Sequence, residues 1–184
     1  MMHGALMILT GSRGSGKTTL CRELAAAARR SGADVAGVLS PASFVGTRKV
    51  GIEAMDLRSG ETRPLARRHD SARPGTLELC SWSFDERVLA WGNALLQSAT
   101  PCDLLVVDEL GPLELLEGRG WTAGLDAVDS GGYDRALVVV RPGLLEQARA
   151  RWPRAVLVDV GDASARRRFE ALFTGAAAKG REAR

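Results

Sequence analysis

Cysteine and histidine are scarce in this sequence, which has three cysteines and two histidines among 184 residues. The cysteines, Cys21, Cys80 and Cys102, are odd in number and include no Cys-x-x-Cys pair, so neither a disulfide framework nor a zinc site is indicated. Both histidines, His3 and His69, lie in segments that we expect to be irregular, so neither is a catalytic candidate. This composition suits the reducing cytoplasm, where we expect the protein to be located.

Long apolar runs and a strong charge of one sign are also absent. No apolar run approaches the ~20 residues needed to span a bilayer, and the N-terminus lacks the features of a signal peptide. The 25 basic and 22 acidic residues leave a formal net charge of +3, without a basic stripe interleaved with aromatics. We therefore expect a soluble protein with neither a membrane nor a nucleic acid as its partner. A protein partner is not indicated, although none is excluded.

Length and hydrophobic content predict one domain. Hydrophobic residues make up 45% of the 184 residues, which is enough for one substantial core but little for two. We expect a single domain over residues 1–175. Residues 176–184 are alanine, glycine and charged residues, which predict a flexible C-terminal tail.

Short apolar runs alternate with helical patterns along the chain. Strands are predicted at residues 5–10, 34–39, 62–66, 104–107, 136–140 and 155–160. Helices are predicted at residues 18–30, 84–97 with Ser83 as the N-cap, 121–128, 144–152 and 164–173. Residues 44–57 alternate around a turn at 46–48, which predicts a β-hairpin, and the polar residues 67–75 predict a mobile loop.

This alternation predicts an α/β fold with three layers, α/β/α. Strands that are followed by crossover helices form a mostly parallel sheet that is covered on both faces. The hairpin would add an antiparallel pair at one edge of that sheet.

Residues 11–18, Gly-Ser-Arg-Gly-Ser-Gly-Lys-Thr, match the P-loop pattern Gly-x-x-x-x-Gly-Lys-Ser/Thr at every fixed position. Glycines let successive backbone N–H groups surround a polyphosphate. Lys17 would contact the β- and γ-phosphates, and Thr18 would bind Mg²⁺ at the start of a helix. A chance match in a chain of this length is expected on the order of 1% of the time or less. We predict nucleoside triphosphate binding by Gly11, Ser12, Arg13, Gly14, Ser15, Gly16, Lys17, Thr18 and Thr19.

Two acidic residues, Asp108 and Glu109, follow the apolar run at 104–107. Open α/β sheets bind ligands at the carboxyl ends of their strands. We therefore predict that Asp108 holds Mg²⁺ and that Glu109 orients and deprotonates the attacking water, so Lys17 and Glu109 are the catalytic candidates. Alternatively, the two carboxylates only end a strand in solvent. Glu114 either faces the site or lies on a solvated turn.

A further cation would stabilise the negative charge that develops on the γ-phosphate in the transition state. The candidates are Arg13 in the loop, Arg48 and Lys49 on the hairpin, and Arg141 after the strand at 136–140. The sequence does not distinguish among them, and each could equally face solvent. The four tryptophans are expected to pack, although one of them could cover the nucleobase: Trp82, Trp91, Trp121 and Trp152.

With these motifs in place, the chain resembles the THEP1-like nucleoside-triphosphatases, which are small cytosolic P-loop enzymes. The resemblance lies in GSRGSGKTTL, in GVLSPASFVGTRKVGIEAMDLRSGE and in VVDELGPLELLEGRGW. Many NTPases share the first segment, whereas the run Asp-Glu-x-Gly-Pro-x-Glu in the third is more specific.

The resemblance implies hydrolysis of nucleoside triphosphates to diphosphates, with loose base preference, on a RecA-like sheet with Mg²⁺. It implies phosphate binding by residues 11–19, Mg²⁺ binding by Thr18 and Asp108, and water activation by Glu109. Two patterns differ from the family's. The hairpin usually reads Gly-x-Arg-x-Gly-Phe, whereas here a shifted Gly51 precedes Ile52, and no clear Arg-x-Gly-x-Tyr lies around residues 75–82. These differences leave the base pocket open.

We therefore expect a Mg²⁺-dependent P-loop NTPase that hydrolyses ATP, GTP and other nucleoside triphosphates to diphosphate and phosphate. One alternative is a small P-loop kinase that passes the γ-phosphate to a metabolite under a lid of arginines, Arg63, Arg67, Arg68 and Arg73. The Asp-Glu pair favours water as the acceptor. Another alternative is a nucleotide-dependent switch or assembly factor. No Asn/Thr-Lys-x-Asp signature for guanine is present, which argues against a GTP-binding version.

Overall fold

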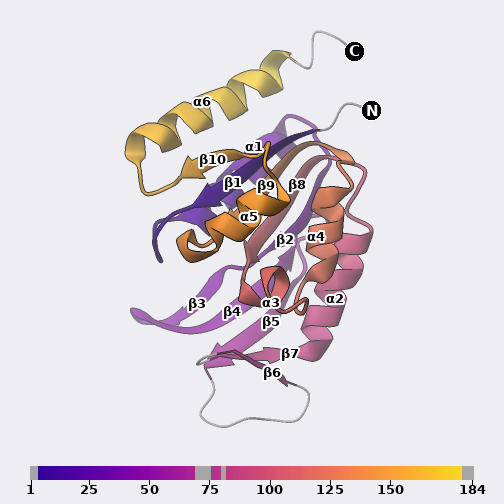
Figure 1. Ribbon diagram of the computed structural model, residues 1–184, viewed down its shortest axis with the longest axis vertical. Coiled ribbons are helices and arrows are strands. Elements are labelled where there is room, and N and C mark those ends of the chain that lie inside the picture. The colour runs from indigo at the N-terminus through magenta and orange to yellow at the C-terminus, as the bar shows by residue number, and fades with distance from the viewer. Residues whose placement is uncertain (1–3, 69–75, 80–81, 180–184) are drawn as a thin grey trace.

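A ten-stranded sheet runs through the molecule, and helices pack against both of its faces (Figure 1). The computed structural model describes residues 4–68, 76–79 and 82–179. The strands are β1 Ala5–Thr10, β2 Val35–Leu39, β3 Ala42–Val45, β4 Arg48–Asp56, β5 Thr62–Arg68, β6 Thr76–Leu79, β7 Trp82–Asp85, β8 Cys102–Leu110, β9 Tyr133–Val140 and β10 Val156–Asp159. The helices are α1 Lys17–Arg30, α2 Glu86–Gln97, α3 Pro112–Leu115, α4 Thr122–Asp129, the 3-10 turn Pro142–Leu144, α5 Leu145–Arg151 and α6 Ala163–Lys179.

The sheet has a parallel half and an antiparallel half. Strands β10, β1, β9, β8 and β2 are neighbours in that order and all parallel, in the upper part of Figure 1. Strand β4 pairs antiparallel with β2, and β5, β7 and β6 continue the sheet beyond it. The β3–β4 hairpin is present as predicted. It is not a simple edge addition, however, because β4 is an internal strand of the sheet.

The register of the parallel strands brings their carboxyl ends together. Ile8 of β1 lies opposite Val138 of β9, and Val138 lies opposite Val107 of β8. Val107 in turn lies opposite Val38 of β2. The residues that follow these positions therefore meet at one edge of the sheet, which is where the phosphate loop, defined here as residues 11–18, leaves β1.

The four strands β1, β9, β8 and β2 bury side chains on both faces of the sheet. Because successive side chains of a strand point to opposite faces, Val106 packs in the cluster that contains α1 and α6, whereas Val107 packs in the cluster with α2 and α4. Residues buried on both faces give the continuous apolar runs by which the sequence predicted these strands. No helix in the described residues is long and apolar enough to cross a membrane.

Some element boundaries near the candidate site differ from the predictions. Strand β8 continues to Leu110, so Asp108 and Glu109 lie within the strand rather than after it. Phe84 belongs to β7, which pairs with β5 and β6, and the N-cap of α2 is Asp85 instead of Ser83. The Asp85 carboxylate accepts a hydrogen bond from the Arg87 N–H at 2.8 Å, which satisfies a free donor of the first turn.

The predicted mobile loop and C-terminal tail lie largely outside the described residues. Residues 67 and 68, expected in the loop, complete β5, and residues 69–75 are not among those described. Helix α6 continues to Lys179, beyond the expected boundary at 175, and residues 180–184 are again outside the described part.

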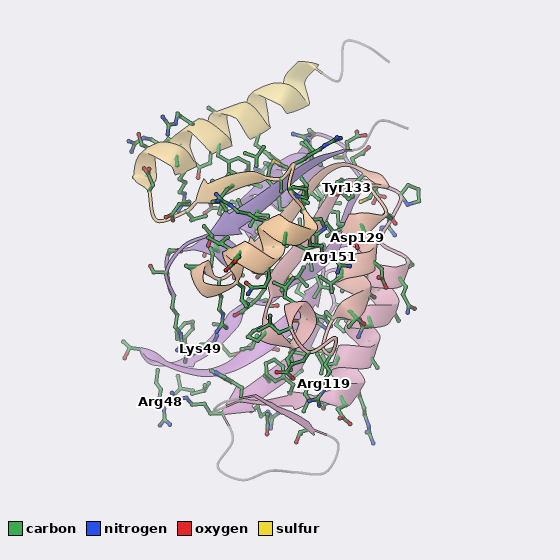
Figure 2. All side chains as sticks on the ribbon, viewed as in Figure 1. Arg48, Lys49, Arg119, Asp129, Tyr133 and Arg151 are labelled. Carbon is green, nitrogen blue, oxygen red and sulfur yellow. The ribbon has the colours of Figure 1, made fainter. Side chains whose placement is uncertain are left out.

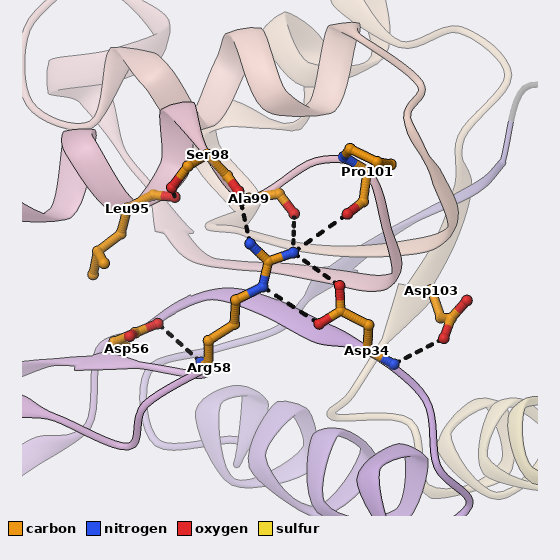
Figure 3. Close-up of polar contacts among 8 residues, drawn as sticks. All are labelled: Asp34, Asp56, Arg58, Leu95, Ser98, Ala99, Pro101 and Asp103. Carbon is orange, nitrogen blue, oxygen red and sulfur yellow. Dashed lines mark hydrogen bonds and ion pairs between the residues drawn. The ribbon is translucent and has the colours of Figure 1, made fainter.

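An arginine ties the two halves of the fold together at the edge of the sheet remote from the phosphate loop (Figure 3). Arg58, in the turn after β4, donates to the carbonyl oxygens of Ser98 at 2.7 Å and Ala99 at 3.1 Å, just beyond α2. The same guanidinium pairs with the Asp34 carboxylate at 2.8 Å, next to β2. These bonds satisfy carbonyl groups that follow the helix and hold the antiparallel half against it.

Candidate active site

The phosphate loop has the backbone conformation for which its glycines are required. Gly11, Gly14 and Gly16 have φ angles of 138°, 80° and 91°, which side chains with a Cβ rarely adopt. A Cβ at Gly11 would also lie 2.8 Å from the Ser15 Oγ atom. Gly16 is the N-cap of α1 and provides no side chain to cap it. The first N–H groups of α1 are thus directed into the loop, as at the anion-binding helix termini of other proteins.

Lys17 lies within this loop. Its Nζ atom donates to the carbonyl oxygens of Gly11 and Ser12, both at 2.8 Å, and lies 3.4 Å from the Ser15 Oγ atom. Burial lowers the pKa of Lys17, while the nearby Glu109 and Asp108 carboxylates act to raise it. The ammonium group therefore contacts the loop carbonyl oxygens and lies within electrostatic reach of the two acids of β8.

Asp108 is buried beneath the loop, with 1% of its surface exposed. Its Oδ2 atom accepts a hydrogen bond from the Ser40 N–H at 3.0 Å, and the Ser40 hydroxyl donates to the Asp108 carbonyl at 3.1 Å. Burial raises the pKa of Asp108 to about 6, although the Ser40 N–H, the Thr18 hydroxyl and the Lys17 ammonium all favour the charged form. The interior thus holds a carboxyl group that ionises only with difficulty.

The arrangement of Asp108 and Thr18 fits a magnesium ion. The Thr18 hydroxyl lies close enough to lower the Asp108 pKa, yet the Oδ1 atom of Asp108 completes no hydrogen bond within the described residues. A buried oxygen without a partner is costly, and a cation would satisfy it. Among the described residues no group of three or more His, Cys, Asp or Glu side chains could hold a metal. Magnesium in NTPases typically takes one or two protein oxygens together with phosphates and water, so this pair is sufficient.

Asp108 also makes a testable contribution to stability in the metal-free protein. Because its folded pKa of about 6 lies above the ordinary 3.8, ionising this carboxyl favours unfolding, and the penalty grows between pH 4 and pH 6 and is complete above pH 6. We expect the free energy of unfolding of Asp108→Asn to rise by about 2–3 kcal/mol relative to that of the unsubstituted protein as the pH goes from 4 to 7. Urea unfolding in EDTA at both pH values measures this difference. A gap that stays the same at both pH values would contradict it.

Glu109 has an unusual backbone conformation. It is the one non-glycine residue in the described ranges with a positive φ angle, 72°. The pairing of β8 with β9 shifts between Val107 and Leu110, so a β-bulge lies at the two acids. Such bulges re-aim side chains next to active sites. A strained conformation of this kind costs of order 1–3 kcal/mol and persists where the fold over-determines it, often at functional sites.

Three of the four candidate cations lie around the two acids. Arg141 donates its Nε to the Oε1 atom of Glu109 at 2.7 Å, and its Nη2 atom pairs with the same oxygen. Burial lowers the pKa of Lys49, the Glu109 and Asp108 charges raise it, and Arg13 and Arg141 lower it, so all these groups are neighbours. Lys49 Nζ also lies 5.0 Å from the Trp82 ring centre.

Arg48 differs from these three. It is exposed and lies on the other side of the hairpin from Lys49 (Figure 2). Thr19, which the sequence included among the nucleotide-binding residues, lies exposed on the first turn of α1. Of the predicted residues, the structure thus brings Lys17, Thr18, Asp108 and Glu109 together, with Arg13, Lys49 and Arg141 around them.

Glu114 has a structural position that the sequence left undecided. It is 8% exposed, so the alternative of a solvated turn is wrong. Its Oε2 atom accepts from the Gly111 N–H at 2.8 Å, and its Oε1 atom accepts from the Trp121 N–H at 2.9 Å. Burial raises the Glu114 pKa, and these two N–H groups lower it. Glu114 therefore holds the segment after Glu109 in place.

A cavity of about 250 Å³ adjoins Glu109. Four charged residues line it, Arg13, Glu109, Glu114 and Arg141. Apolar side chains form much of the rest of its wall, Ile52, Leu65, Trp82, Phe84, Leu89, Leu113 and Trp121. The sequence did not predict this cavity, because its wall comes from many separate elements. Trp82 and Trp121 were expected to pack, with the alternative that one of the four tryptophans covers the nucleobase.

Comparison with known proteins gives a family and several relatives. The model of the NTPase family matches residues 6–128. The nucleoside-triphosphatase THEP1 of Methanopyrus kandleri is 32% identical over 110 residues, which span 59% of this chain and 59% of the relative. That of Thermofilum pendens is 30% identical over 123 residues, or 67% of each chain. The match to the first of these therefore spans about three fifths of that relative's length.

Two solved structures have a similar fold. The solution structure of a human cancer-related nucleoside triphosphatase superposes with a TM-score of 0.69 at 23% identity, covering 98% of this chain and 100% of that one. The crystal structure of THEP1 from the hyperthermophile Aquifex aeolicus superposes with a TM-score of 0.53 at 19% identity, covering 85% and 90%. At these identities the likeness concerns the fold, which is mixed α/β with one large sheet.

Proposed function

We propose, from the premise that this chain belongs to the NTPase family, that it is a Mg²⁺-dependent enzyme that hydrolyses nucleoside triphosphates to diphosphate and phosphate. The observation on which the proposal depends is the convergence of Lys17 and Thr18 with the two acids of β8, Asp108 and Glu109. ATP and GTP are the proposed substrates, among others. We further propose that the fold is the three-layer, RecA-like form of P-loop NTPases.

The phosphate loop would bind the triphosphate through backbone N–H groups and the Lys17 ammonium. Lys17 now donates to two loop carbonyl oxygens, at 2.8 Å each, and would exchange these for the β- and γ-phosphates. Thr18 and Asp108 would hold Mg²⁺, and the bound ion would neutralise charge on the phosphates. The unpartnered Oδ1 atom of Asp108 supports this assignment.

Glu109 would accept a proton from the attacking water. Water oxygen then bonds to the γ-phosphorus, the bond to the bridging oxygen of the β-phosphate breaks, and the diphosphate leaves. Glu109 is bound to Arg141 in the structure, so that its carboxylate is already oriented. A γ-phosphate in the loop would compete for the same guanidinium, which would leave the Glu109 carboxylate free to act on water.

The test of the function is phosphate release from ATP, GTP, CTP and UTP without any added acceptor, with Mg²⁺ or with EDTA. We expect release with Mg²⁺ and none with EDTA. If no triphosphate gives phosphate under either condition, hydrolysis is not the function of this site.

Arg141 is the cation that we propose to stabilise the transition state, because it already contacts Glu109. Arg141→Ala should lower kcat about 100-fold, the size expected for the loss of one oriented charge at a reacting phosphate, with a smaller change in KM. Steady-state phosphate release measures both constants. Arg48→Ala is the matched control, because Arg48 is exposed on the far side of the hairpin (Figure 2), and its kcat should stay within about twofold. Equal losses in the two variants would contradict the role of Arg141.

A further inference from the structure

The cavity beside Glu109 has a feature that hydrolysis does not require. The charged residues Arg13, Glu109, Glu114 and Arg141 share a cavity of about 250 Å³ with a larger number of apolar side chains. Water, as the acceptor of a phosphoryl group, needs only room for one molecule next to the base. This cavity has room for about eight water molecules at the volume that water occupies in the liquid.

The apolar wall is built by the antiparallel half of the sheet and the helices that cover it. Ile52 of β4 and Leu65 of β5 are 5% and 3% exposed, and Leu89 of α2 is 8% exposed. Trp82 and Phe84 of β7 add two aromatic rings. A mostly apolar cavity with a few polar groups is typical of small-molecule sites.

The position of the cavity indicates which molecule it holds. In the proposed function, Glu109 faces the γ-phosphate, which is the end of the triphosphate opposite to the nucleoside. A group bound beyond Glu109 therefore lies on the side from which the γ-phosphorus is attacked, and not on the side of the base. A molecule bound in the cavity is therefore positioned to attack the γ-phosphorus.

We propose that this cavity binds a second substrate, a small uncharged ring compound that carries a hydroxyl group on a short arm, and that the enzyme phosphorylates this hydroxyl. The inference rests on the proposed function, because it uses the same triphosphate and the same base. The ring packs against the apolar wall, where aromatic side chains favour it. The arm places the hydroxyl oxygen next to Glu109.

The chemical step parallels hydrolysis. Glu109 accepts the hydroxyl proton, the alcohol oxygen bonds to the γ-phosphorus, and the bond to the β-phosphate oxygen breaks. The products are a phosphate monoester and the nucleoside diphosphate. A positioned hydroxyl competes well with water, because groups held in a reactive geometry reach effective concentrations on the order of 10⁵ M or more.

The arginine lid that the sequence offered for a kinase is not the basis of this inference. Arg63 donates to Glu61 at 2.8 Å and lies 4.4 Å from the Trp91 ring centre, so it is engaged elsewhere. Arg67 and Arg68 belong to β5, and Arg73 lies outside the described residues. The proposed acceptor site is instead formed by the apolar side chains of the cavity wall and by the charged groups Arg13, Glu109 and Arg141.

The experiment supplies the enzyme with ATP and Mg²⁺ and with benzyl alcohol or cyclohexylmethanol, and toluene serves as the control that lacks a hydroxyl. Phosphorus NMR separates the monoester from inorganic phosphate. We expect a monoester from at least one alcohol, with a ratio of monoester to inorganic phosphate above one at saturation. Inorganic phosphate alone from both alcohols overturns the acceptor site and leaves the hydrolase intact, even if the alcohols slow hydrolysis. If toluene and the alcohols instead raise the KM for ATP alike, the cavity holds the nucleobase and the inference is wrong.

Two further outcomes separate this inference from the proposed function. A monoester without inorganic phosphate supports the acceptor site and shows that hydrolysis is not the main reaction. If neither product forms, both proposals fall.

A substitution in the wall tests the location of the acceptor. Leu89→Trp and Leu65→Phe each add bulk from a different element, and each should lower the ratio of monoester to inorganic phosphate about tenfold or more. Because the two products come from competing reactions at the same active site, their ratio does not depend on how much folded enzyme is present. Ala94→Phe adds the same kind of bulk on the exposed side of α2 and should leave the ratio unchanged. An unchanged ratio in both wall variants contradicts the location.

Discussion

Replacing Lys17 with alanine should abolish measurable nucleotide binding. The Lys17 ammonium group is directed into the phosphate loop, with the Gly11 and Ser12 carbonyl oxygens 2.8 Å away. Removing one partner of a buried charge pair costs roughly 2–5 kcal/mol, which is about 30-fold to several thousandfold in affinity. Titration calorimetry with a non-hydrolysable ATP analogue and Mg²⁺ measures this loss.

The control for this prediction is that the Lys17→Ala variant remains folded. Lys17 contacts the loop and not the core, so Lys17→Ala should keep the circular dichroism spectrum and the cooperative unfolding of the unsubstituted protein. Arg48→Ala, which removes an exposed cation on the other side of the hairpin from Lys49 (Figure 2), should bind the analogue normally. If the Lys17 variant is folded and still binds within about threefold, the ammonium group does not contact the phosphates.

Glu109→Gln should retain nucleotide binding and lose turnover by about a thousandfold. Glutamine has nearly the same shape as glutamate but cannot accept a proton, and general-base catalysis contributes roughly 10²- to 10⁴-fold. The Arg141 guanidinium would lose its charged partner, so it remains available to a bound γ-phosphate. Single-turnover phosphate release and calorimetry together measure the two effects.

A matched control lies in the same stretch of chain. Glu117 is an exposed carboxylate that pairs with Arg119 at 3.7 Å, and Glu117→Gln should hydrolyse ATP at the normal rate. Equal activity in the Glu109 and control variants refutes the assignment of the base. A Glu109 variant that loses binding and turnover together would indicate a role in holding the nucleotide.

The phosphate loop could be predicted from the sequence because its chemistry is local. Gly11, Gly14 and Gly16 are needed for backbone angles that few other residues adopt, so the positions of the glycines in the sequence already indicate the conformation of the loop. Four of the parallel strands, β1, β2, β8 and β9, were also predictable, because a strand buried on both faces has a continuous apolar run. Asp108 and Glu109 followed such a run, which placed them at the correct edge of the sheet.

The antiparallel half was predicted less completely. Strand β6 was not foreseen, and Phe84 was placed in a helix although its backbone pairs with β5 and β6. Four-residue strands have too few alternating positions to be distinguished from a helix start, and only tertiary pairing decides between them.

The cavity and the position of Glu114 required the structure as well. The cavity wall combines residues as distant as Ile52 and Trp121, which no local pattern relates. Glu114 accepts bonds from Gly111 and Trp121 N–H groups, and the second of these depends on how the intervening chain returns. Local signals can identify the acid but not its partner.

Because β8 is irregular at Asp108 and Glu109, the arrangement of these two acids cannot be transferred to another protein by copying the sequence alone. In a regular strand, adjacent residues face opposite sides of the sheet, so a carboxylate after Asp108 would point away from it. Here the shift in pairing and the φ angle of 72° at Glu109 change the direction of the second side chain. Grafting Asp-Glu into a regular strand of another protein would therefore reproduce the sequence but place the two carboxylates on opposite faces of the sheet.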